Sequence, residues 1–150
     1  MAKHFIIPAT TLLAMAALPA SAQTVGVNAA VVNDVRMTTQ AGGVPGIDVA
    51  EAASRLSTDD PHGALLVDVR ENDELAVVRV ADATHVPTST FVEHAQELPT
   101  DRPLLMMCAT GVRSAAVIGY LLRSGWTDVL NVEGGITAWQ RAGLPVERGR

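Results

Sequence analysis

The segment with the clearest chemical potential contains the only cysteine of the chain. Cys108 begins the run Cys-Ala-Thr-Gly-Val-Arg-Ser, which lies between a short apolar segment and a helix-like segment. A cysteine that faces a helix N-terminus lies near the positive end of the helix dipole, which favours the thiolate over the thiol. Because a thiolate is a nucleophile, we predict that Cys108 is a catalytic residue.

The residues that follow the cysteine suit an anion-binding loop. Ala109 and Thr110 are small, and Gly111 can adopt the positive φ that a tight loop often requires. Such a loop can turn successive backbone N–H groups inward. Arg113 adds a permanent positive charge and a planar fork that matches oxyanions. We therefore assign these residues, together with Val112, to the binding of a small anionic substrate.

A structural role for the cysteine is the competing interpretation. Free cysteine is among the most buried residue types, so a thiol at a strand end can simply be part of the core. With one cysteine the chain can form no internal disulfide, and the thiol is either inert or reactive. The glycine, arginine and serine that follow it at a helix start favour the reactive interpretation.

Strand-like and helix-like segments alternate from Ile47 onward. Continuous apolar runs, as expected of strands buried on both faces, occupy residues 64–67, 104–107 and 129–132. A weaker strand is predicted at residues 83–86. This alternation predicts an α/β fold with a mainly parallel sheet. Ligands of such sheets bind beyond the carboxyl ends of strands, and Cys108 directly follows one of these ends.

Helices are expected between the strands. Asp48 is placed to cap the first of them, with Glu51 at its third position. A short helix that Ser89 or Thr90 caps is expected to end at Glu97. The helix that Asp48 caps is predicted at residues 49–56, and further helical segments are predicted at residues 71–80 (weakly), 115–123 and 136–141.

The N-terminal residues resemble a signal peptide. Lys3 and His4 precede a mostly apolar stretch, and Ala20-Ser21-Ala22 fits an A-x-A cleavage site. We expect residues 1–22 to be removed after Ala22 and the protein to be exported to the periplasm. Residues 23–46 are then a leader, and residues 47–150 form one domain.

Composition narrows the range of partners. The net charge is −5, and it becomes −6 without Lys3, with 10 basic against 16 acidic residues. This balance argues against nucleic acid or, after signal cleavage, a membrane surface as a partner. Aromatic residues make up 3% of the chain, too few to suggest a platform for stacking bases.

Four segments in order resemble the rhodanese family. The run C-x-x-G-x-R-S after an apolar strand resembles the active-site loop of that family. Three further segments match family patterns: residues 65–71 with Glu74 (L-V-D-V-R-E-x-x-E), residues 85–87 (h-I-P), and residues 132–135 with Ala138 and Trp139 (E-G-G-x-x-x-W). The resemblance covers about residues 47–146.

The resemblance implies a single domain with a five-stranded parallel sheet flanked by helices. It implies that Cys108 accepts sulfane sulfur from thiosulfate, a persulfide or a polysulfide, and passes it to cyanide, a thiol or an acceptor protein. Backbone N–H groups of residues 109–113 would hold the persulfide, and Arg113 would hold the anionic donor. Ser114 would be the helix start, and no cofactor is implied. The family's frequent G-H-I-x-G-A stretch is absent here, where residues 78–83 read Val-Arg-Val-Ala-Asp-Ala.

Other polar residues are weaker candidates. Asp68 and Arg70 follow a predicted strand, where they either support the site or form a structural pair, and we favour the pair. His62, His85 and His94 show no metal-ligand spacing with Cys108 or with one another, so no metal site is predicted.

Two other functions remain open. Phosphatases and arsenate reductases related to this family place the arginine one residue further from the cysteine, whereas four residues separate Cys108 from Arg113 here. The shorter loop favours sulfur chemistry. A non-catalytic module that binds a partner or senses sulfur or redox state is the second alternative, although many such modules lack the cysteine that this chain keeps.

Overall fold

The computed structural model describes residues 43–149, apart from residues 58–59 and 61. The predicted signal peptide, its cleavage after Ala22 and most of the predicted leader lie outside the described residues. Within the described part of the chain, no helix combines the length and the hydropathy that crossing a membrane would require.

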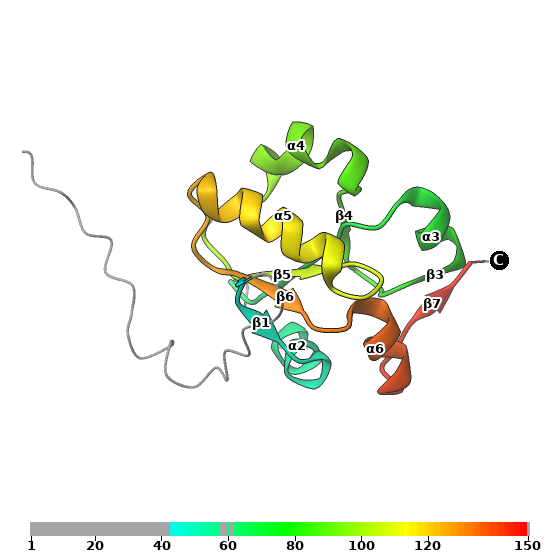
Figure 1. The fold of residues 1–150 in the computed structure, drawn as a ribbon. Coiled ribbons are helices and arrows are strands. Elements are labelled where there is room, and N and C mark those ends of the chain that lie inside the picture. Colours follow the sequence, from blue (N-terminus) through cyan, green and yellow to red (C-terminus); the bar gives the residue numbers. More distant parts are fainter. Residues whose placement is uncertain (1–42, 58–59, 61, 150) are drawn as a thin grey trace, which may run out of the picture.

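Five parallel strands form the central sheet, which confirms the predicted fold class (Figure 1). Their spatial order is β1-β6-β5-β2-β4, and every neighbouring pair is parallel. The strands are β1 (Gly46–Ile47), β2 (Leu65–Asp68), β4 (Thr84–His85), β5 (Leu104–Met107) and β6 (Val129–Val132). Their carboxyl ends therefore meet at one edge of the sheet, where a site is expected.

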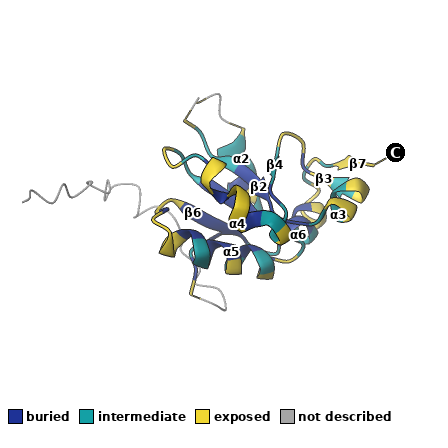
Figure 2. Ribbon diagram, turned by 90° about the horizontal axis from the view of Figure 1, so that it is seen from above, coloured by how far each residue is buried: buried dark blue, intermediate teal, exposed yellow. Residues whose placement is uncertain are grey.

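Helices cover both faces of the sheet. In Figure 1, α4 and α5 lie on one face, and α2 and α6 lie on the other. The helices are α2 (Val49–Leu56), α3 (Asn72–Val77), α4 (Phe91–His94), α5 (Val112–Arg123) and α6 (Gly135–Arg141), and 3₁₀ turns flank α4 at Thr88–Thr90 and Ala95–Glu97. Figure 2 shows the central strands β2 and β6 as largely buried, whereas β7 and much of the helices are exposed.

Burial on both faces explains why the sequence of β5 is a continuous apolar run. Successive side chains of a strand point to opposite faces. Leu104 and Met106 pack into the core on the α5 side, and Leu105 and Met107 pack into the core on the α6 side. All four residues are fully buried. Both faces of the central strand therefore demand apolar residues.

The start of α2 also follows its sequence. The Asp48 carboxylate accepts hydrogen bonds from the backbone N–H groups of Ala50 and Glu51, both at 2.9 Å. These bonds satisfy two of the donors that a helix leaves without partners in its first turn. The predicted cap is confirmed.

Two helix predictions are wrong in part. The segment predicted as a helix over residues 71–80 is helical only to Val77. Val78–Arg79 then forms β3, which pairs antiparallel with β7 (Glu147–Arg148). The hydrogen-bond partners of the β3 backbone lie in β7, near the other end of the domain. Local helix propensity cannot indicate such a long-range pairing. The helix predicted to end at Glu97 is a short α-helix, α4, between two 3₁₀ turns, and the Thr90 side chain accepts no capping hydrogen bond.

Candidate active site

Cys108 lies at the carboxyl edge of the sheet, between β5 and α5. Gly111 is the residue before α5 and has a φ of +96°, which a residue with a Cβ rarely adopts. The helix begins at Val112, three residues before the predicted start at Ala115. Ser114 is therefore inside the first turn and is not the helix start, because the loop closes more tightly than the sequence pattern suggested. The cysteine faces the N-terminus of a 12-residue helix, as predicted.

Hydrogen-bond donors of the loop and of the first turn of α5 lie around the Cys108 sulfur. The backbone N–H of Gly111 donates to Sγ at 3.1 Å, and the Ser114 hydroxyl oxygen lies 3.4 Å from Sγ. The cysteine itself is only 1% exposed. Of the backbone N–H groups predicted to hold the sulfur, that of Gly111 donates to Sγ here, and the role of the whole loop in holding a persulfide stays a prediction.

The surroundings of Cys108 favour its charged form. Burial raises the pKa of the thiol, because a medium of low polarity disfavours charge. The Ser114 hydroxyl and three backbone N–H groups, those of Ser114, Thr110 and Gly111, outweigh burial and leave the pKa below the ordinary thiol range. A larger share of the cysteine is therefore thiolate near neutral pH than in an unfolded chain.

This shift predicts the pH dependence of alkylation. The rate of reaction of Cys108 with iodoacetamide rises with pH and levels off above the pKa, because only the thiolate reacts. We expect the midpoint for the folded protein to lie at lower pH than the midpoint for the same protein in urea. Since the chain has one cysteine, both curves report the same group. Coincident midpoints, or a higher one in the folded protein, would contradict a stabilised thiolate.

Asn131 holds two parts of the cradle from the neighbouring strand β6. Its Nδ2 donates to the Gly111 carbonyl oxygen at 3.0 Å, and its Oδ1 accepts from the Ser114 hydroxyl at 2.6 Å. The residue is fully buried. Sequence reasoning missed Asn131, although an asparagine within the apolar run Val-Leu-Asn-Val is a detectable sign of a required hydrogen bond.

The two contacts of the Ser114 hydroxyl compete. A hydroxyl has one proton to donate, so it cannot serve Asn131 and Cys108 together. The distance to Asn131 is 2.6 Å against 3.4 Å to the sulfur, so the proton goes to Asn131 in this arrangement. The backbone N–H groups are therefore the more dependable stabilisers of the thiolate, and the Ser114 hydroxyl lowers the pKa of Cys108 only while its proton is shared with the sulfur.

Helix α6 brings its N-terminus against the backbone of the loop. The N–H of Ile136 donates to the Cys108 carbonyl oxygen at 2.9 Å, and the N–H of Thr137 donates to that of Ala109 at 3.2 Å. At Gly135 a Cβ would lie 2.2 Å from the Cys108 carbonyl oxygen, so glycine is required for this approach. Gly135, the first residue of α6, therefore allows the helix to approach the loop this closely.

Arg113 is paired with a carboxylate of the protein itself. Its Nη1 and Nη2 donate to Glu74 Oε2 and Oε1 at 2.6 and 2.7 Å. The hydrogen bond from Arg113 lowers the pKa of Glu74 to about 2, although partial burial acts in the opposite direction. The predicted role of Arg113 in holding an anionic donor stays a prediction. Glu74 entered the sequence analysis only as part of a family pattern.

Asp68 and Arg70 form a buried pair of their own. Arg70 Nη2 donates to Asp68 Oδ2 at 2.6 Å and to the Val78 carbonyl oxygen at 3.0 Å. The Arg70 side chain is 2% exposed and that of Asp68 is 1% exposed. Their hydrogen bonds tie the end of β2 to β3, in keeping with the structural role that we favoured from the sequence.

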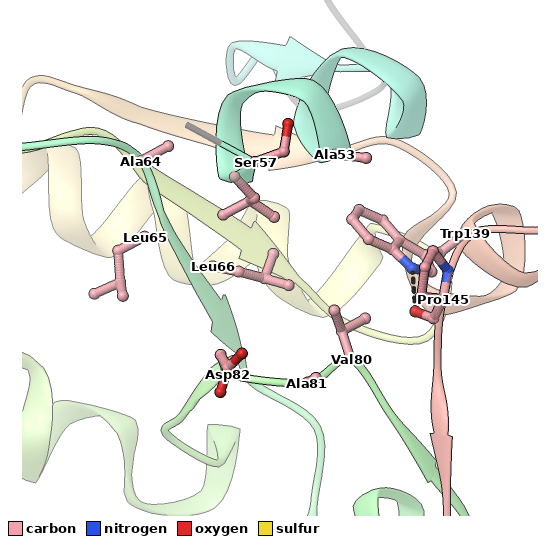
Figure 3. A pocket seen from close by; sticks show the side chains of 11 residues that line it. Ala53, Ser57, Ala64, Leu65, Leu66, Val80, Ala81, Asp82, Trp139 and Pro145 are labelled. Carbon is pink, nitrogen blue, oxygen red and sulfur yellow. Dashed lines mark hydrogen bonds between the residues drawn. The ribbon is translucent and has the colours of Figure 1, made fainter. Parts of the chain in front are cut away.

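A separate cavity lies away from Cys108. It has a volume of about 480 Å³ and is lined by α2, the start of β2, residues 80–82 and Trp139 of α6 (Figure 3). Figure 3 also shows the Trp139 ring nitrogen directed at the Pro145 carbonyl oxygen, at 3.0 Å. Cys108 follows the opposite, carboxyl end of the sheet. The described residues include no cluster of three side chains suited to holding a metal ion.

Several known proteins are similar to this chain in sequence and in fold. A family model described as the rhodanese-like domain matches residues 48–142. A sulfurtransferase of Allochromatium vinosum is 38% identical over 100 residues, which span 67% of this chain and 92% of that protein. The thiosulfate sulfurtransferase GlpE of Vibrio cholerae is 33% identical over 101 residues, with the same coverage. A rhodanese-related protein of Thermoplasma volcanium matches at a TM-score of 0.61 and 31% identity, covering 68% of this chain and 96% of that one.

Proposed function

This chain belongs to the rhodanese family, and from that premise we propose that it is a sulfurtransferase that carries sulfane sulfur on Cys108 as a persulfide. The observation that carries the proposal is the environment of the sulfur. Cys108 Sγ accepts a hydrogen bond from the Gly111 N–H at 3.1 Å at the N-terminus of α5. The relatives named as sulfurtransferases support the reaction class.

The reaction needs two displacements at sulfur. In the first, the Cys108 thiolate attacks the sulfane sulfur of thiosulfate. An S–S bond forms to Sγ, and the bond to the sulfonate sulfur breaks with its electron pair leaving on sulfite. In the second, cyanide or a thiolate attacks the outer sulfur of the persulfide and leaves as thiocyanate or as a new persulfide. The Cys108 thiolate is restored, and no external redox reagent is consumed.

The protein contributes charge stabilisation in both steps. The negative charge resides on Cys108 before loading and on the persulfide afterwards. The N–H groups of the loop and the positive end of α5 stabilise either anion. Because the chain has no second cysteine, the sulfur must leave to another molecule.

The intact mass of the protein tests the proposal. After incubation with thiosulfate or with a low-molecular-weight persulfide, we expect a gain of about 32 Da on Cys108, the mass of one persulfide sulfur. Cyanide should remove the added mass and release thiocyanate. If a confirmed free thiol gains no sulfur from either donor, the proposed function is wrong.

The other functions considered have weaker support. Four residues separate Cys108 from Arg113, and the guanidinium of Arg113 faces Glu74. Neither feature favours a wide cradle for a phosphate or arsenate group. A purely binding role gives no reason for a cysteine held as a stabilised thiolate. We also propose that the protein acts in the periplasm, on the basis of the predicted signal peptide at residues 1–22.

A further inference from the structure

The Glu74–Arg113 ion pair connects α3 to the first turn of α5, beside the loop that holds Cys108 (Figure 1). The two side chains are 31% and 34% exposed, so the pair can be reached from solvent. Both guanidinium Nη atoms donate to the carboxylate, at 2.6 and 2.7 Å. The one arginine of the loop is therefore neutralised before any donor arrives.

The other charged side chains near Arg113 leave its surroundings without a net positive side-chain charge. Glu71 and the Cys108 thiolate both act on the Arg113 charge, and both are negative. Arg70, whose charge also acts on Glu74, is buried against Asp68. Glu74 has a pKa of about 2, so it stays ionised at any pH at which the protein would be assayed. The charged side chains around Arg113 thus supply no net positive charge that would attract a dianion.

An oxyanion bound to Arg113 would also lie beside the Glu74 carboxylate. The end-on pair occupies one N–H of each Nη and leaves other donors of the guanidinium unused. If an oxygen of the sulfur donor accepted hydrogen bonds from these unused N–H groups, it would lie within a few ångströms of the negative Glu74 carboxylate. The repulsion between the two negative charges opposes binding. The repulsion from Glu74 increases with the negative charge of the sulfur donor.

We propose that Glu74 determines which donors the site accepts, by disfavouring thiosulfate dianion relative to a persulfide of low net charge. This inference rests on the proposed sulfur transfer and specifies its donor class. With a persulfide R–S–SH, the Cys108 thiolate attacks the outer sulfur. An Sγ–S bond forms, the S–S bond of the donor breaks, the thiolate R–S⁻ leaves with the electron pair of that bond, and the outer sulfur stays on Cys108 with its proton.

The experiment compares rates of persulfide formation on Cys108 in the wild type and in Glu74→Gln. The donors are thiosulfate, with two negative charges, and cysteamine persulfide, whose ammonium group offsets its anionic sulfur. Glutamine keeps an oxygen acceptor for Arg113 and the shape of the side chain, but it removes the charge. Glu51→Gln is the matched control, since Glu51 also pairs with an arginine at 2.7 Å with similar exposure, on α2.

In Glu74→Gln we expect the second-order rate with thiosulfate to rise by about 10-fold, because a like charge has been removed from the binding site. The rate with cysteamine persulfide should change by less than about 2-fold, and the control should match the wild type with both donors. Added salt should reduce the advantage of the variant, since it screens the repulsion.

Three outcomes would overturn the inference. A lower thiosulfate rate in Glu74→Gln would mean that Glu74 only positions Arg113. An unchanged rate would mean that its charge does not reach the donor. Equal gains with both donors would mean that the loop had loosened without a change in selectivity. If the wild type forms no persulfide with either donor, the proposed function itself fails, which is a distinct result.

Discussion

Replacing Cys108 with serine is expected to lower the rate of sulfur transfer by a factor of about 10³ or more, because the covalent carrier is lost. A hydroxyl remains protonated at neutral pH and cannot hold sulfur as a stable persulfide. The N–H of Gly111, which lies 3.1 Å from Sγ, then has a neutral oxygen in place of a thiolate. Thiocyanate formation from thiosulfate and cyanide measures the loss, and the intact mass shows whether any sulfur is bound.

The fold of Cys108→Ser serves as its control. Serine is slightly smaller than cysteine and fits the same buried position, so circular dichroism and the oligomeric state should match those of the wild type. Glu51→Gln provides a second control, with a substitution on α2 that should leave transfer intact. If Cys108→Ser retained more than a few per cent of the activity, sulfur would have to travel by a route without the cysteine.

Removal of the Asp68 carboxylate should have the largest effect on stability. In Asp68→Ala, the Arg70 guanidinium would keep its contact with the Val78 carbonyl oxygen but would lose its charge partner. An unpaired buried charge is costly, and breaking such a pair typically lowers the free energy of unfolding by about 3–5 kcal/mol. Because a domain of this kind is stable by only about 5–15 kcal/mol, urea denaturation should show a clear shift of the midpoint.

Glu51→Ala is the comparison for that measurement. It removes the partner of Arg55 on the surface of α2, where both side chains are partly exposed. Water replaces a lost surface partner, so the free energy of unfolding should fall by no more than about 1 kcal/mol. If Asp68→Ala cost no more than Glu51→Ala, the buried pair would not be holding the end of β2 to β3.

Much of the sheet could be predicted from the sequence. The runs at residues 104–107 and 129–132 coincide with β5 and β6, and the cap at Asp48 starts α2 as expected. These features are local: a strand buried on both faces needs an unbroken apolar run, and a helix start needs a side-chain acceptor. The position of Cys108 at the carboxyl end of β5 follows from the same reasoning.

The sequence by itself thus determined the parallel α/β sheet, the candidate nucleophile and the loop that follows it, because each of these features depends on residues that are close together in the sequence. Only the tertiary structure decided the partners of that loop. Glu74 and Arg113 are 39 residues apart, and Asn131 reaches Gly111 from 20 residues away. The strand β3 depends on β7 at the far end of the domain. Such pairings arise when segments that are distant in the sequence pack against each other. A local sequence pattern does not indicate which of these segments will be in contact.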